Sequence, residues 1–219
     1  MIGKLLFLRK RVIDLLLSVD GEPATVSLND LRFSLKSGAS ELNKEPSLTS
    51  VLAAVSGLVD DGRDPYVSLQ FGAGVSLQAL HDLCALLSSV DTEKGMRIEP
   101  PRPGQLFYKA FAPASTFLDR ESRMAQPWEL RLVSKESGVT AILTRIEETW
   151  KAGQPRPDLK PINYEVATPE ALKQALQQYG PGLPVILVIA QPRITHGQLM
   201  TFLAPVLPIH STIHVFLKE

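Results

Sequence analysis

The sequence predicts an α/β fold made of two-layer α+β units, in which helices pack on small sheets. Two observations lead to this prediction. Segments with helical spacing and good capping residues alternate with short β-branched segments that are typical of strands. One strand–turn–helix pattern also occurs twice, because residues 65–90 align without a gap onto residues 184–209. We therefore expect two similar subdomains, each containing a βαβ unit.

The clearest elements lie in the C-terminal third. Thr168 is a good N-cap for a helix, and Gly180 fits the end of that helix. The run "PVILVIA" is continuously apolar and β-branched, as in strands buried on both faces. Thr195 is placed to cap a second helix, which Pro205 should end or bend. The expected order is helix 168–180, strand 184–190, helix 196–207 and strand 211–219.

The N-terminal half carries a related order. A Ser-capped helical stretch is expected over residues 27–38, and a longer helix ends near Gly62. A strand and a helix follow within residues 65–90, and prolines close a last strand at 94–101. Residues 104–113 and 127–134 have strand chemistry, residues 139–153 fit a helix, and residues 154–167 read as extended.

Three regions follow from these elements, with a boundary near residues 100–104. We expect an amphipathic N-terminal segment over residues 1–22, a first α/β unit over 23–103, and a second unit with a Pro-rich lead-in over 104–219. The apolar runs near the start are too short for an export signal or a bilayer span. The chain as written is therefore expected to be soluble without detergent.

Composition argues against nucleic acid as a partner. The 23 Lys and Arg residues balance 23 Asp and Glu residues, and only 6% of residues are aromatic. Nucleic-acid binding favours basic faces and stacking aromatic side chains. The single cysteine, Cys84, lies in a helical pattern and is best interpreted as a small buried apolar residue.

The "QPRITHGQ" turn, residues 191–198, is the main candidate site. His196 follows a buried strand, where α/β proteins place ligands, so it is a candidate base or contact residue beside Arg193. The plainer interpretation makes His196 an early helix residue next to a Thr cap. On that interpretation Thr195→Ala should cost about 0.5–2 kcal/mol, and His196→Ala should change stability little.

Three other residues are candidate partner contacts. His210 and His214 share one face of a predicted strand but stand roughly 13 Å apart, too far for one metal ion. Trp128 fits an interface or the core equally well. No motif for a catalytic nucleophile, a metal or a cofactor is present, so we expect no catalytic residues, no metal and no cofactor.

The repeated unit resembles the periplasmic domain of the ExbD/TolR family of biopolymer-transport proteins. The resemblance rests on "TPEALKQAL", "PVILVIA", "QPRITHGQ", "LMTFLAPV" and "TIHVFLKE". It covers residues 164–219 well and residues 26–99 loosely. It implies a small α/β domain that dimerises on the periplasmic side of the cell envelope, beside an ExbB-like membrane channel protein.

The family also begins a membrane helix with an Asp before an apolar run. Asp14 before "LLLSV" is similar to that start, which implies a proton-carrying role. The run stops at Asp20, several turns too soon, so an ordinary amphipathic helix is the competing interpretation.

Two functions follow. The first is a non-enzymatic ExbD/TolR-like interaction module of a proton-driven envelope transport or motor complex, acting by protein–protein contact. The second is a small α/β enzyme with its site at the Gln191–Gln198 turn. The first implies the cell envelope, and without the resemblance the expected location is the cytoplasm.

Overall fold

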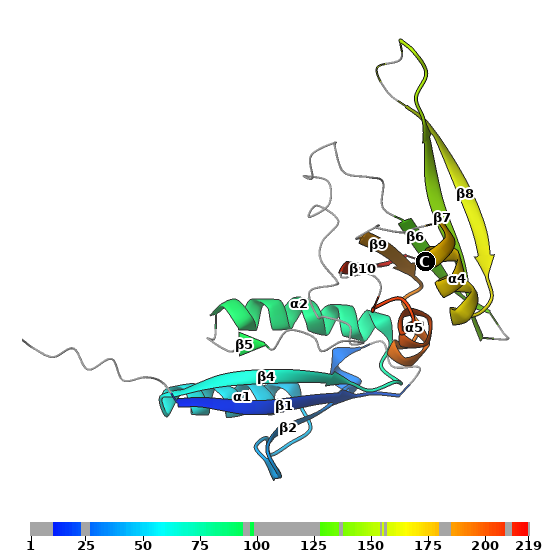
Figure 1. Ribbon diagram of the computed structural model, residues 1–219. Coiled ribbons are helices and arrows are strands. Elements are labelled where there is room, and N and C mark those ends of the chain that lie inside the picture. The colour runs from blue at the N-terminus through cyan, green and yellow to red at the C-terminus, as the bar shows by residue number, and fades with distance from the viewer. Residues whose placement is uncertain are drawn as a thin grey trace, which may run out of the picture.

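In a computed structural model, the described residues form two five-stranded mixed sheets, each accompanied by two α-helices (Figure 1). The structure describes residues 11–22, 27–93, 97–98, 128–135, 138–153, 155, 157–179, 185–208 and 212–218. The predicted α/β fold of two similar units is confirmed. The boundary expected near residues 100–104 lies outside the described residues, between the last strand of the first unit and the first strand of the second.

The first unit has the strand order β3-β2-β1-β4-β5. Strands β1, β4 and β5 are parallel to one another, β2 pairs antiparallel with β1, and β3 pairs antiparallel with β2. The elements are β1 (Arg11–Asp20), a short 3-10 helix η1 (Leu28–Asp30), β2 (Arg32–Ser37), β3 (Ser40–Glu41), α1 (Leu48–Asp60), β4 (Arg63–Phe71), α2 (Leu77–Glu93) and β5 (Arg97–Ile98).

The described strands and α-helices of the second unit repeat this topology in the same order. Its strand order is β10-β9-β6-β7-β8, so β6, β7, β8, β9 and β10 take the places of β1, β2, β3, β4 and β5. Strands β6, β9 and β10 are parallel to one another. The elements are β6 (Trp128–Lys135), β7 (Gly138–Thr149), β8 (Asp158–Val166), α4 (Pro169–Tyr179), β9 (Val185–Ala190), α5 (His196–Leu203) and β10 (Thr212–Leu217).

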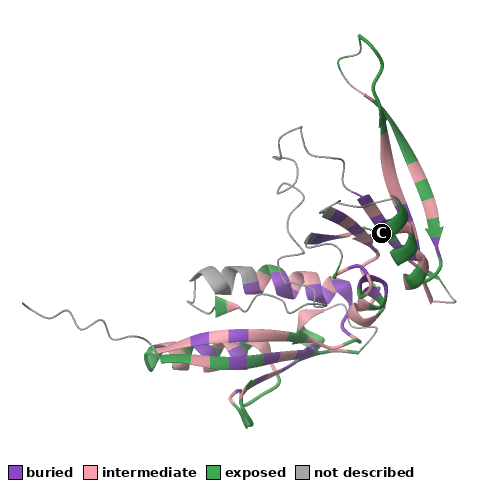
Figure 2. Ribbon diagram, in the orientation of Figure 1, coloured by how far each residue is buried: buried purple, intermediate pink, exposed green. Residues whose placement is uncertain are grey.

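Each sheet buries one face, which Figure 2 shows as an alternation along the strands. In β1 every second residue, from Leu15 to Val19, is buried, and in β6 Trp128, Leu130 and Leu132 are buried. Successive strand side chains point to opposite faces, so the residues between these look away from the core. The two units share one continuous set of buried apolar residues.

Three predicted helices are wrong. Residues 11–20 form the central strand β1, residues 139–149 lie in β7, and residues 32–37 form β2 after the single turn of η1. In β7 the β-branched residues favour a strand, and the burial of Ala141 and Leu143 has a period of two. Gly153, expected to end a helix, has a φ of 82° beyond the end of β7.

The described part of the N-terminal segment, residues 11–22, therefore belongs to the first unit and contains a strand, not a separate helix. Asp14 lies in β1 opposite Tyr66 of β4, and its side chain is exposed. The helix start that would give Asp14 a proton-carrying role is absent from this strand. Within the described ranges, no helix has the length and apolar character needed to cross a membrane.

Candidate functional site

The "QPRITHGQ" turn pairs with the equivalent turn of the first unit. Ser76 and Thr195, which are aligned residues of the two copies, form an antiparallel bridge with each other. On one side His196 N–H donates to the Val75 carbonyl at 2.7 Å, and on the other Leu77 N–H donates to the Ile194 carbonyl at 2.8 Å. Leu77 is aligned with His196, and Val75 with Ile194, so each bond is the counterpart of the other. The junction therefore has a local twofold relationship.

A second pair of bonds extends this junction. Gly197 N–H donates to the Ala73 carbonyl at 2.9 Å, and Gln78 N–H donates to the Pro192 carbonyl at 3.0 Å. The N–H groups at the start of α2 and α5 have no carbonyl partner within their own helix. The two units therefore satisfy each other's helix starts.

The predicted helix cap is confirmed in the second unit. The Thr195 hydroxyl accepts from Gln198 N–H, and the Gln198 side chain accepts from Thr195 N–H, which together form a capping box. In the first unit the Ser76 hydroxyl accepts from Ala79 N–H at 3.2 Å. The two caps occupy aligned positions, but only the second has the reciprocal bond.

Close backbone approach explains Gly197. A Cβ atom on Gly197 would stand 2.9 Å from the Ala73 Cβ and 3.0 Å from the Ala73 carbonyl oxygen. Such distances require a shift in one of the two turns. The sequence alone offered only the mild helix penalty of a glycine in a first turn, because the opposing backbone is remote in the chain.

His196 lies at the edge of the junction and is half-buried. Its ring meets Phe71 edge-on, with 5.7 Å between ring centroids. Burial lowers the pKa of His196, and a hydrogen bond to the Gly72 backbone opposes part of that shift. Arg193, in the same turn, is exposed.

The structure separates the other predicted contact residues. Trp128 is 2% exposed, so its interface interpretation is wrong and the core interpretation holds. His214 is buried in β10 beside Leu187 of β9, which contradicts a surface contact. His210 lies outside the described residues.

Trp150 is the exposed tryptophan, and the sequence analysis does not identify it as a candidate contact. Trp150 is 64% exposed at the end of β7, and Leu159, which pairs with Glu148, is 54% exposed near the start of β8. The outer part of β7 and β8 extends beyond the rest of the sheet as a two-stranded ribbon (Figure 1). The misassigned helix over residues 139–153 concealed this hairpin.

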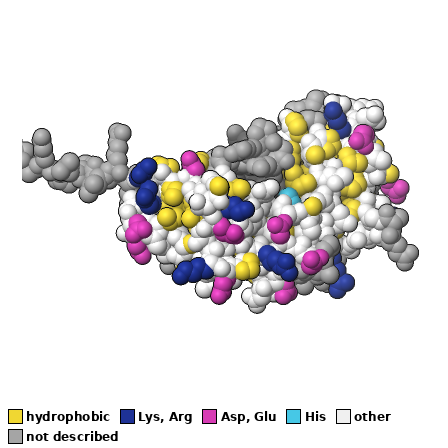
Figure 3. All heavy atoms as spheres, turned by 90° about the horizontal axis from the view of Figure 1, so that it is seen from below, with side chains coloured by type: hydrophobic (Ala, Val, Ile, Leu, Met, Phe, Trp, Pro, Cys, Tyr) yellow, Lys and Arg dark blue, Asp and Glu magenta, His cyan; other side chains and the backbone are white. Residues whose placement is uncertain are grey.

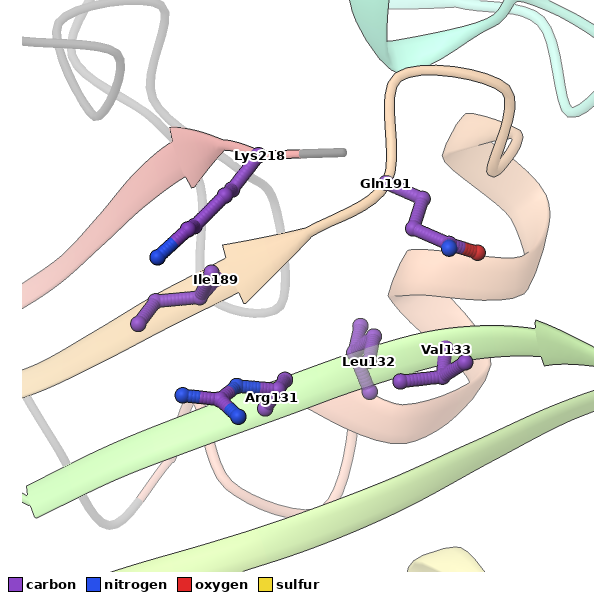
Figure 4. Close-up of a pocket in the computed structure, with 6 residues that line it drawn as sticks. All are labelled: Arg131, Leu132, Val133, Ile189, Gln191 and Lys218. Carbon is purple, nitrogen blue, oxygen red and sulfur yellow. The ribbon is translucent and has the colours of Figure 1, made fainter.

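A hollow of about 120 Å³ opens at the carboxyl ends of β6 and β9. Figure 4 shows Arg131 and Lys218 extending to the same side, with Ile189 between them. Its lining consists of Arg131, Leu132, Val133, Ile189, Gln191 and Lys218. On the face shown in Figure 3, by contrast, acidic and basic side chains are interspersed.

Cys84 is buried, as expected. Burial raises the pKa of its thiol far above the usual value, which keeps it protonated and unreactive. Within the described part of the chain, no three His, Cys, Asp or Glu side chains come together in a way that could hold a metal ion.

Fold and junction together define a tandem α/β protein of two similar, mutually paired units. No family model and no curated protein sequence matches it. Among solved structures, the protease–reverse transcriptase of prototype foamy virus is 12% identical with a TM-score of 0.21. The match covers 96% of this chain, which spans 36% of that chain's length, and at such a TM-score the likeness supports no conclusion.

Proposed function

We propose that this chain is a non-enzymatic interaction module of the ExbD/TolR type. It acts by protein–protein contact in a proton-driven envelope transport or motor complex, on the periplasmic side and beside an ExbB-like channel protein. The observation that supports the proposal is the junction between the two turns. The resemblance implies a small α/β unit that dimerises, and here two such units pair within one chain.

The hydrogen bonds of the candidate turn favour a structural role over catalysis. His196 and Gly197 donate their amides to the other unit, and Thr195 is occupied by its capping box. Backbone amides that are already bonded are not available to stabilise a substrate anion. The turn therefore acts as a joint, and contacts with a partner fall on other surfaces.

The hairpin tip is the surface that offers most to a partner. Trp150 and Leu159 are the most exposed large apolar residues among those described, and they lie on the same projecting ribbon. Exposed tryptophans are enriched where protein interfaces gain their energy. We expect the tip to contact the partner.

Photo-crosslinking in the native organism tests this function. A photoreactive residue is placed at Trp150, and a matched one at Val12, which is also exposed but lies on the first sheet. We expect the Trp150 position to capture a membrane protein of the channel type, and the Val12 position to capture less of it. Capture of soluble proteins alone at both positions would contradict the proposal.

One observation favours the alternative, a small enzyme with its site at Gln191–Gln198. Burial keeps His196 neutral at physiological pH, and a neutral imidazole is the form that accepts a proton. A substrate screen with the parent chain and the His196→Leu variant separates the two functions. An activity that His196→Leu abolishes while the fold is retained would establish the enzyme and refute the interaction module.

A further inference from the structure

The hollow on the second sheet presents only hydrogen-bond donors among its polar side chains. Arg131 and Lys218 are exposed, and neither forms an ion pair with a described residue. Gln191 is held in place because its Oε1 accepts from Ser134 N–H at 2.9 Å. That bond leaves the Gln191 amide nitrogen as a third donor at the rim.

The floor of the hollow is apolar. Ile189 lies on β9 directly opposite Arg131 on β6. Val133, the next residue of β6 on the same face, adds a second apolar side chain to the lining. Figure 4 shows the two basic side chains on either side of Ile189.

Two matched positions in the first unit carry different side chains. The residue pairs across the parallel strands put Ser18 where Arg131 lies, and Gln70 where Ile189 lies. The Ser18 hydroxyl donates to Gln70 Oε1 at 3.4 Å, so these polar groups satisfy each other. Gly72 stands in place of Gln191. The fold therefore does not require a cation on the central strand or an apolar side chain beside it.

We propose that this hollow binds an acidic side chain of a partner protein, within a segment that also carries apolar residues. The carboxylate lies between Arg131 and Lys218, and the methylene stem of the Asp or Glu and a neighbouring apolar side chain cover Ile189 and Val133. A volume of about 120 Å³ admits one side chain and not a folded element. This inference deepens the proposed function, because it gives protein contact a defined surface and chemistry.

A peptide carboxylate fits better than a free inorganic anion. Phosphate binds best where several backbone amides converge, as in a nest or at a helix start. The amides at the start of α5 are directed to the first unit. An apolar floor contributes nothing to a bare anion, whereas it buries the stem of an acidic side chain.

A peptide titration followed by amide NMR shifts tests the assignment. The probes are Ac-Leu-Glu-Val-Asp-NH₂, its amide analogue Ac-Leu-Gln-Val-Asn-NH₂, and inorganic phosphate. We expect the acidic peptide to shift the amides of Ile189 and Gln191 and to bind about tenfold more tightly than its analogue, because the contacts are charge-assisted. Binding should weaken as salt rises from 50 mM to 300 mM.

Matched variants locate the effect. Arg131→Gln combined with Lys218→Gln should lower affinity about tenfold or more, since both cations are lost. Arg131→Lys should retain part of the affinity, and Ile189→Gln, which copies the first unit, should weaken the acidic peptide. Lys36→Gln on the first sheet is the control and should change nothing.

Three results would overturn the inference. These are equal binding of the two peptides, phosphate binding as tight as that of the acidic peptide, or shifts confined to residues outside the hollow. The test does not depend on the crosslinking result. Peptide binding without channel capture would refute the proposed complex and support the hollow as a binding site. Channel capture without peptide binding would support the complex and refute the hollow as a binding site.

Discussion

The two units share a topology but differ on the faces that look away from their helices. Buried positions are apolar in both, as in the matched strand residues Leu17 and Leu130 and the matched helix residues Leu80 and Leu199. Outward-facing positions diverge, since Ser18 and Gln70 correspond to Arg131 and Ile189. Packing constrains the first set, and solvent leaves the second free to acquire specific contacts.

The hairpins differ in the same sense. In the first unit β2 and β3 turn at Ser37 and Ser40 with Gly38 at a φ of 57°, which makes a tight loop. In the second, β7 and β8 run out to the pair Thr149 and Asp158 and carry Trp150 at the tip. The first unit thus resembles a plain scaffold, while the second carries both features that suit a partner.

The largest predicted effect compares the first buried residues of the two central strands. Trp128 opposes Ile186 as Leu15 opposes Val67, so the two side chains fill matched places. Trp128→Ala should destabilise the protein by about 3–5 kcal/mol and Leu15→Ala by about 2–5 kcal/mol. Urea melts give both values. Unchanged stability in Trp128→Ala would restore the view that this tryptophan is a surface contact.

The next prediction concerns the joint between the units. Gly197→Ala brings a Cβ within 3.0 Å of the Ala73 carbonyl oxygen, so it should cost about 1–3 kcal/mol through forced displacement of the paired turns. Gly57→Ala in α1 is the matched control, because its Cβ meets nothing within 4 Å. The control should stabilise the chain by about 0.5–1 kcal/mol. Equal changes in the thermal stability of the two variants would contradict the claim that close contact with Ala73 requires glycine at position 197.

Sequence reasoning succeeded where the signal was local. The aligned copies predicted two similar units, and Thr195 and its turn identified the start of α5. It failed for β1 and β7, where strand and helix patterns compete within one window. Leu15, Leu16 and Leu17 make an apolar run without clear alternation, and only the neighbouring strands decide that Leu16 faces outward.

The candidate site was found in sequence but its contacts were not. "QPRITHGQ" was identified as a turn, yet its partner is the first unit's turn, which lies more than 100 residues earlier in the chain. Pairing between remote backbones leaves no periodic signal. The sequence does not reveal the Arg131 and Lys218 pair for a related reason, since β9 lies between β6, which carries Arg131, and β10, which Lys218 follows.

The two caps provide a smaller and sharper contrast. Ser76→Ala and Thr195→Ala should each cost about 0.5–2 kcal/mol, because each removes an acceptor for a helix-start amide. Ser76 and Ala79 are fully buried, so in Ser76→Ala the Ala79 amide cannot form a replacement hydrogen bond with water. The loss of stability should therefore be larger for Ser76→Ala than for Thr195→Ala. Urea melts at neutral pH measure both. A larger loss for Thr195→Ala would show that its reciprocal bond with Gln198 outweighs burial.

The smallest effect concerns pH at a position where the joint departs from its twofold relationship. His196 corresponds to Leu77, and it faces Phe71 where the matched residue is Ala190. Burial lowers the pKa of His196 below the ordinary value for a histidine side chain. The unfolded chain therefore binds a proton first as pH falls, so this residue lowers the stability of the fold from about pH 6.5 downward, and its contribution levels off below the folded pKa. His196→Leu, which places at this position the residue type of Leu77, should remove that part of the pH dependence.

The sequence alone predicts little effect of losing the His196 side chain. The contacts with Phe71 and Gly72 mean, however, that His196→Ala should also cost some stability at pH 8. Urea melts of the three proteins between pH 5 and pH 8 measure both effects. A stability difference between the parent and His196→Leu that stayed constant across this range would mean that the imidazole is not the group that titrates.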